Sequence, residues 1–155
     1  MRRIILIMCY SILVGCKTYN SNEKSISEYK QSINQQPSNQ ILLKKAILYN
    51  GDIKAYNSLN TEYLDYAFTE EFLLYAMIMA NKFDYPQAYY DVFTCLTDVY
   101  LSDLHQIDDK TASMAIDYLL KANERGHQQA TEIVTEYKIQ RNENSKQQIQ
   151  RIFKK

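Results

Sequence analysis

The sequence predicts an all-α domain built from about three antiparallel helical hairpins. Glycine and proline are scarce: beyond residue 15 the chain contains only Gly51, Gly126, Pro37 and Pro86. An all-β domain needs turn residues about every 8–12 positions, so this scarcity argues against one. From residue 40 onward, apolar side chains recur at spacings of three and four, which places them on one face of a helix.

The first three expected helices lie between residues 41 and 80. Residues 41–50 form the first, and Gly51 follows it as the residue that closes many helices in a left-handed conformation. Asp52 is expected to cap the second helix. The apolar stripe of that helix consists of Tyr56, Leu59, Tyr63 and Tyr66. Residues 72–80, FLLYAMIMA, are apolar all round, so we expect this third helix to be buried on most sides at the centre of the fold.

Three further helices are expected in the second half. Pro86 suits the first turn of a helix that covers residues 86–101. Residues 102–109 form a polar loop, and residues 110–125 form the next helix, which ends at Gly126. The last helix runs from residue 127 to about residue 141, with a continuation into the basic tail as the alternative.

Three short stretches of the sequence resemble one another. GDIKA at 51–55, DYPQA at 84–88 and GHQQA at 126–130 each follow one expected helix and open another, at turn-to-turn spacings of 33 and 42 residues. Ala80 and Ala122 stand four residues before the second and third turns. Small residues at these positions allow paired helices to approach closely, which favours a repeated helical hairpin.

The last copy, DDKTASMAIDYLLKANERGHQQATEIV, resembles a Sel-like repeat, a short relative of the tetratricopeptide repeat. The family pattern falls on Asp109, Ala112, Tyr118, Lys121, Ala122, Gly126, Ala130 and Val134. The middle copy matches loosely and the first poorly, and the loop lacks the glycines that usually mark it. The resemblance implies a small α-solenoid, a right-handed stack of hairpins that binds protein, and it implies no catalytic residues.

The first sixteen residues resemble a bacterial lipoprotein signal. Arg2 and Arg3 precede an apolar run over residues 4–14, and the run ends in Leu13-Val14-Gly15-Cys16. We expect residues 1–15 to be a signal peptide, Cys16 to carry lipid, and residues 16–37 to form a flexible tether. A secretory peptide with an incidental cysteine and a buried N-terminal helix are the alternatives. Lys17 stands where Asp would indicate inner-membrane retention, which favours the periplasmic face of the outer membrane, with the cell surface as the alternative.

Charge is unevenly distributed along a chain whose net charge is zero. Residues 52–109 carry eleven acidic and two basic residues, a net charge of −9, whereas residues 138–155 carry six basic residues and one acid, a net charge of +5. We expect a helical-repeat domain over residues 38–141 and a basic C-terminal tail over residues 142–155. The acidic segment excludes nucleic acid as a partner and favours a basic protein, unless its acids only solvate the outer helix faces.

Tyrosine is abundant, with fourteen in the chain. Tyrosines anchor interfaces when the ring is buried and the hydroxyl stays in water, although in helical repeats they also fill gaps between helices. Tyr89 and Tyr90 point about 100° apart on a helix, so we do not expect the two side chains to lie in the core together. We therefore predict an acidic, tyrosine-lined binding face. Its residues are Tyr85, Tyr89, Tyr90, Asp91 and Asp98.

Residues that carry catalytic chemistry are few. His105 and His127 are the only histidines, Cys95 lies among apolar neighbours, and the zinc, calcium, phosphate-loop and serine-elbow motifs are absent. We expect no enzyme activity, cofactor or metal. The favoured function is a lipid-anchored periplasmic protein-binding module, similar to immunity proteins that neutralise toxins exchanged between bacteria. The alternatives are an accessory lipoprotein of envelope assembly or secretion, and a carboxylate-dependent hydrolase.

Overall fold

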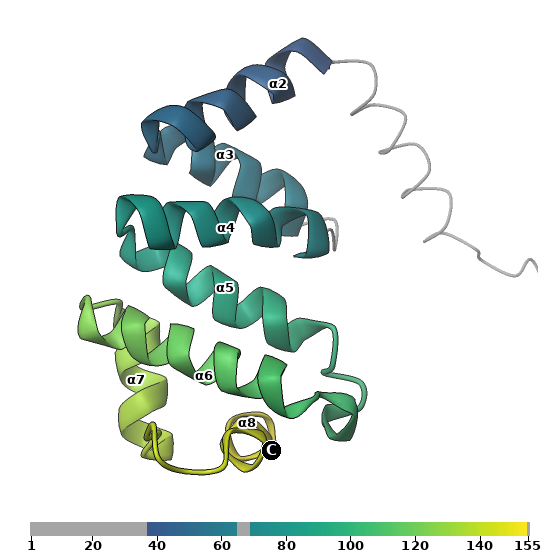
Figure 1. Ribbon diagram of the computed structural model, residues 1–155, viewed down its shortest axis with the longest axis vertical. Coiled ribbons are helices and arrows are strands. Elements are labelled where there is room, and N and C mark those ends of the chain that lie inside the picture. The colour runs from purple at the N-terminus through teal and green to yellow at the C-terminus, as the bar shows by residue number, and fades with distance from the viewer. Residues whose placement is uncertain (1–36, 65–68, 155) are drawn as a thin grey trace, which may run out of the picture. The chain divides into compact units, whose positions relative to one another are not determined.

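The computed structural model describes residues 37–64 and 69–154, and every regular element in these ranges is a helix (Figure 1). The all-α prediction is therefore confirmed for the described part of the chain. No helix within it has both the length and the apolar character needed to cross a membrane. Cys16, the expected signal peptide and the expected tether up to residue 36 lie outside the described residues.

Seven α-helices, a π-helical turn (η1) and a 3-10 turn (η2) make up the described residues. In chain order the elements are α2 (Pro37–Lys45), η1 (Ala46–Asn50), α3 (Ile53–Leu64), α4 (Thr69–Phe83), α5 (Pro86–Asp98), η2 (Leu104–Gln106), α6 (Asp109–Glu124), α7 (Gln128–Tyr137) and α8 (Ser145–Phe153).

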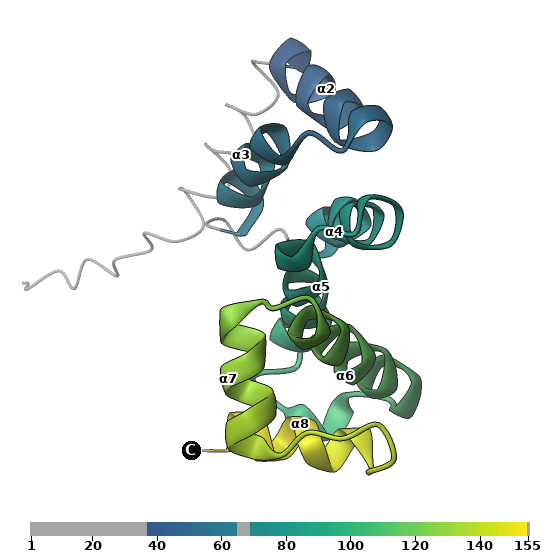
Figure 2. The same cartoon turned by 90° about the vertical axis from the view of Figure 1, so that its left-hand side faces the viewer.

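Consecutive helices from α2 to α7 pack against one another in chain order. A turn of two or three residues joins η1 to α3, α4 to α5, and α6 to α7, and the helices on either side of such a turn (α2 and α3, α4 and α5, α6 and α7) are called a pair below. Helix α5 packs most extensively, against α4 on one side and α6 on the other. In Figure 2, the first helices of the pairs lie toward one side, and α3 and α7 lie toward the other. The core between them is apolar and aromatic. Its largest fully buried side chains include Tyr56, Phe72, Ile47, Leu59, Met79, Ile107, Leu119 and Val92.

A residue in the left-handed conformation lies in the turn between the two helices of each pair. Gly51, Asp84 and Gly126 have φ values of 62°, 54° and 76°. Glycine adopts this conformation without steric cost, and Asp is among the few other residues that visit it routinely. The three aligned stretches of the sequence therefore begin at residues with the same backbone conformation.

The first two turns also share their hydrogen bonds. Gly51 N–H donates to the carbonyl of Ile47, and Asp84 N–H donates to that of Ala80, both at 3.1 Å. The following residue in each case donates to the carbonyl one residue further back, Asp52 N–H to Ala46 and Tyr85 N–H to Met79, so that the last carbonyls of the helix are satisfied. Asp52 then accepts from the N–H groups at the start of α3, as its position in the sequence predicts.

The first two turns each contact the C-terminal end of the following pair's first helix. Gly51 lies against the ring of Phe83, which leaves no room for a Cβ atom. Asp84 accepts a hydrogen bond from Nε of Arg125. Phe83 and Arg125 occupy equivalent places, because each directly precedes the left-handed residue of its own pair. The two junctions between pairs are therefore built at the same positions.

Helix α4 is less buried than its sequence predicts. Phe72, Ala76, Met79 and Ala80 are fully buried, but the side chain of Leu74 is 58% exposed. The expectation that this helix is covered on most sides is wrong at that face. The reason is that α4 packs against α3, α5 and η1, which together cover only part of its circumference.

The C-terminal residues differ from the expected tail. Helix α7 ends at Tyr137, because Lys138 adopts a left-handed conformation, and the chain then forms α8 within residues 142–155. Helix α8 packs against α6 and α7, with Ile149 fully buried and the Phe153 ring stacked on Phe93 at 6.2 Å. This segment is basic, but its apolar side also extends the core.

Candidate functional site

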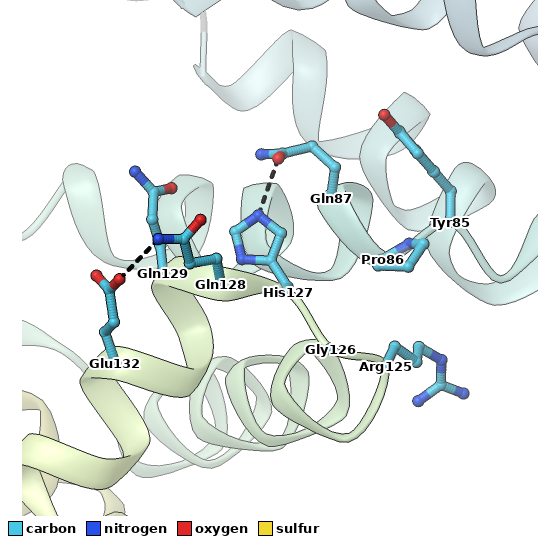
Figure 3. A pocket seen from close by; sticks show the side chains of 9 residues that line it. All are labelled: Tyr85, Pro86, Gln87, Arg125, Gly126, His127, Gln128, Gln129 and Glu132. Atoms are coloured by element: carbon cyan, nitrogen blue, oxygen red, sulfur yellow. Dashed lines mark hydrogen bonds between the residues drawn. The ribbon is translucent and has the colours of Figure 1, made fainter.

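An open groove of about 630 Å³ lies where the N-terminal ends of α5 and α7 meet the C-terminal end of α6. Figure 3 shows the side chains that line it. They are Tyr85, Pro86, Gln87, Arg125, Gly126, His127, Gln128, Gln129 and Glu132. The second and third hairpin turns thus both contribute to this groove.

Local sequence signals position the two walls. The left-handed Asp84 reverses the chain after α4, and Pro86 then begins α5 because its fixed φ suits the first helical turn. On the other wall, Gly126 reverses the chain after α6, and His127 becomes the N-cap of α7. Its Nδ1 accepts a hydrogen bond from Ala130 N–H at 3.3 Å, which satisfies one of the free donors of the first turn.

His127 joins the two walls of the groove. Its Nε2 lies 2.8 Å from Oε1 of Gln87 (Figure 3). Its ring stacks on Tyr90 with centroids 4.6 Å apart. Because Nδ1 accepts from Ala130, the proton of the neutral ring resides on Nε2, which donates to Gln87. Burial lowers the pKa of His127 below its ordinary value, so the neutral form predominates at neutral pH.

The hydrogen-bond chain continues from Gln87 into the core. Nε2 of Gln87 donates to Oδ1 of Asp91 at 2.8 Å. The other carboxylate oxygen accepts from the Tyr56 hydroxyl at 2.6 Å and from the Asn60 amide at 3.3 Å. Side chains from α3, α5 and the start of α7 are thereby linked in one network that crosses all three helical pairs.

Asp91 is the acid at the centre of this network. It is only 3% exposed, and no ion pair among the described residues includes it. Burial raises the pKa of Asp91, while hydrogen bonds from Tyr56 and Gln87 act in the opposite direction. Burial and the neighbouring carboxylate also raise the pKa of Tyr56, so its hydroxyl stays a donor.

The groove is lined by two charged side chains, Arg125 and Glu132. Arg125 is bound to Asp84 and lies over the ring of Tyr89, with its guanidinium carbon 4.2 Å from the ring centroid. Glu132 accepts a hydrogen bond from Gln128 at 3.0 Å. The remaining polar lining consists largely of amide side chains and the tyrosine hydroxyl, which can donate and accept hydrogen bonds.

The five residues of the predicted acidic face do not form one exposed surface. Tyr85 lines the groove, and Tyr90 is half-buried against His127. Tyr89 is 4% exposed and packs against Tyr118, and Asp91 is buried in the network. Asp98 is half-buried, which raises its pKa. The expectation that Tyr89 and Asp91 face a partner is therefore corrected, because both are paired within the fold.

Sequence reasoning did not select the glutamines of the groove. Gln87, Gln128 and Gln129 lie in the aligned stretches DYPQA and GHQQA, directly before or near the buried alanines at 88 and 130. A glutamine one residue before the alanine in both copies was the available signal.

The remaining candidates for chemistry are not reactive groups. Burial, followed by the nearby Asp91 and Asp98, raises the pKa of Cys95 to about 12, so the thiol stays protonated at neutral pH. Within residues 37–64 and 69–154, no cluster of three His, Cys, Asp or Glu side chains is placed to hold a metal ion.

No protein-family model, curated protein or solved structure matches this chain.

Proposed function

We propose that this chain is a lipid-anchored protein-binding module, a small α-solenoid of three stacked hairpins, which binds an extended polypeptide segment in the groove between α5 and α7. The observation that carries the proposal is the groove itself, built by two successive hairpin turns and lined by amide side chains. Cys16 is the proposed site of the lipid anchor, and the periplasmic face of the outer membrane is the proposed location.

The two equivalent junctions support the repeat architecture. Phe83 packs on Gly51 and Arg125 binds Asp84, although the two pairs of residues have no chemistry in common. Equivalent positions that keep their contact while their chemistry changes are expected of degenerate repeats. In such stacks each repeat contacts mainly its neighbours, and the extended surface that results commonly binds protein.

The lining of the groove favours a polypeptide backbone as its ligand. An extended chain offers alternating carbonyl and N–H groups, and a glutamine side chain can pair with either of them. Gln87, Gln128 and Gln129 supply such groups from both walls. A site of this kind needs little charge, since hydrogen bonds to the backbone provide the recognition.

Charge has a separate role in the proposal. The net charge of −9 over residues 52–109 attracts a basic partner at long range, and such attraction acts mainly on the association rate. The amides of the groove act on the lifetime of the complex. Toxin neutralisation and envelope assembly, the two binding roles considered from the sequence, both require a surface of this type.

Site-specific photo-crosslinking in the cells that produce the protein tests this proposal. A photoreactive amino acid is placed at Gln129, which is exposed in the groove, and in a second strain at Thr135, which is exposed on the same helix but outside the groove. We expect a protein adduct from position 129 and none from position 135. The adduct is identified by mass spectrometry, and Gln87→Ala in the same chain should reduce its yield.

Two results would contradict the proposal. Equal adduct yields from both positions would indicate non-specific collision, and no adduct from position 129 would place binding elsewhere. Folding of each variant is checked by circular dichroism, because a loss of helix would also abolish the adduct.

A further inference from the structure

We propose that His127 is a proton-controlled latch on this groove: the neutral ring holds the first turn of α7 against α5, and protonation releases that turn. The effect on binding rests on the function proposed above, whereas the effect on α7 follows from contacts within the chain. The key observation is that the two ring nitrogens are engaged by partners of opposite kind, a donor at Nδ1 and an acceptor at Nε2.

The neutral ring satisfies both contacts at once. Nδ1 accepts from Ala130 N–H and so caps α7, while Nε2–H donates to Gln87 and so ties the cap to α5. The orientation of Gln87 is itself fixed, because its Nε2 donates to a carboxylate oxygen of Asp91, which can only accept while ionised. The buried acid therefore selects the ring tautomer that caps α7.

Protonation removes one of the two contacts. A proton on Nδ1 would point at Ala130 N–H, so that two donors would face each other and the cap would be lost. The contact with Gln87 and the stacking on Tyr90 do not require a free Nδ1 and would persist. The release is thus confined to the first turn of α7, where Gln128 and Gln129 line the groove.

The surroundings of the His127 ring set the pH at which it is protonated and the first turn of α7 is released. The titratable and charged groups near it are Tyr85, Tyr90 and Asp91 of the α5 wall, Arg125 at the end of α6, and Glu132 of α7. The positive charge of Arg125 disfavours protonation of the His127 ring. The negative charges of Glu132 and ionised Asp91 favour it. Since burial is the dominant cause and lowers the pKa of His127, the release belongs to mildly acidic pH.

Hydrogen exchange and ring nitrogen NMR of the full chain test the latch. The chain has two histidines, so His105→Asn leaves His127 as the only titrating ring. In that background we expect the Nε2–H tautomer at pH 7.5. As the ring titrates, the protection factor of the Ala130 amide should fall about fivefold, the size that the loss of an N-cap implies. The amides of α6 serve as the internal reference.

His127→Ser provides the matched control, because serine is a good N-cap that does not titrate. The Ala130 protection factor of this variant should not change between pH 7.5 and 5.5. Asp91→Asn separates the two titrating groups and keeps an amide oxygen that can accept from Gln87, so with it the pH-dependent loss of protection should remain. The latch is disproved if Ala130 keeps its protection while His127 titrates, or if the serine variant shows the same pH dependence.

The binding effect is measured separately with the photoreactive residue at position 129. Adduct yield should fall between pH 7.5 and 5.5 in the parent chain and stay constant in the His127→Ser chain. An unchanged yield in the parent chain would refute the control of binding. No adduct at any pH would refute the proposed function instead, and the hydrogen-exchange result would still decide the latch.

Discussion

Asp91 shows how a single acid can be buried in this fold without a cation. Tyr56, Asn60 and Gln87 donate three hydrogen bonds to its two carboxylate oxygens. Hydrogen bonds to an ionised carboxylate stabilise it and offset part of the cost of burial. The shift of its pKa nevertheless remains upward, so burial outweighs the three donors.

Tyr56→Phe tests this balance. The folded-state pKa of Asp91 is raised, so its contribution to stability is fully present below the unfolded value of about 3.9 and is lost as pH rises through the folded value. Removing a donor raises the folded pKa further. We expect the variant to lose about 1–3 kcal/mol of unfolding free energy at pH 7 and clearly less at pH 4.

Urea unfolding at the two pH values measures this difference. Tyr49→Phe is the matched control, because the Tyr49 side chain is 73% exposed and should tolerate the change at both pH values. An equal loss for Tyr56→Phe at pH 4 and pH 7 would mean that the hydroxyl does not act through the ionised acid.

Gly51 and Gly126 form a second natural comparison between residues. Both adopt left-handed conformations, but a Cβ atom at Gly51 would meet the Phe83 ring, whereas at Gly126 it would enter open space. We expect Gly126→Ala to cost about 1–2 kcal/mol through backbone strain alone. Gly51→Ala should cost about 1–3 kcal/mol more, since Phe83 must move. Equal shifts of the urea midpoint would show that Phe83 is not packed tightly on the turn.

At the scale of the helices, the sequence predicts the helix starts, caps and ends that depend only on residues adjacent along the chain. Gly51, Asp52 and Pro86 are local signals, and the structure places a helix end, an N-cap and a helix start at these residues. The end of α7 was missed, because Lys138 carries no sequence signal for a left-handed conformation. Helix α8 was missed because its charge was considered and the spacing of Ile149, Ile152 and Phe153 was not.

The candidate site was harder to predict for a related reason. Tyr56 and Asp91 are 35 residues apart, and His127 and Gln87 are 40 apart, so no local pattern indicates that they pair. Tyrosines and acids were therefore assigned to a surface, although Tyr89 and Asp91 are buried. The sequence did not predict the groove, and of the five residues of the predicted binding face only Tyr85 lines it.

Helix α8 can be tested through Gln148, which is fully buried. Its amide donates to the carbonyls of Gln140 and Glu143, and its oxygen accepts from Gln140 N–H at 2.8 Å. Gln148→Leu would leave these backbone groups without partners. We expect a loss of about 1–3 kcal/mol in thermal or urea unfolding.

Gln147→Leu is the control for this prediction, because the neighbouring side chain is exposed. It should change stability by less than about 0.5 kcal/mol. Similar losses for both variants would show that α8 is not anchored through the buried amide.

The described helices differ in how extensively they pack, which predicts that they also differ in their resistance to local unfolding. Helices α4, α5 and α6 pack most extensively, whereas α2 keeps Ile41 and Leu42 exposed. Among residues 39–50, whose side chains are described, only Ile47 is fully buried. In stacked architectures, where each unit contacts mainly its neighbours, segments at one end can open while the rest stays folded. We expect the pair of α2 and α3 to open before the others.

Two equally buried leucines test this expectation. Leu59 in α3 and Leu119 in α6 are both fully buried, so replacing either by alanine should cost about 2–5 kcal/mol locally. If the first pair opens independently, Leu59→Ala will accelerate hydrogen exchange in α2 and α3 and leave the amides of α6 at the rate of the parent chain. Leu119→Ala will accelerate exchange in every helix, because the central helices support the first pair through α4. Mass spectrometry of peptides from each helix measures both patterns. Equal acceleration in all helices by Leu59→Ala would mean that the described helices unfold as one cooperative unit.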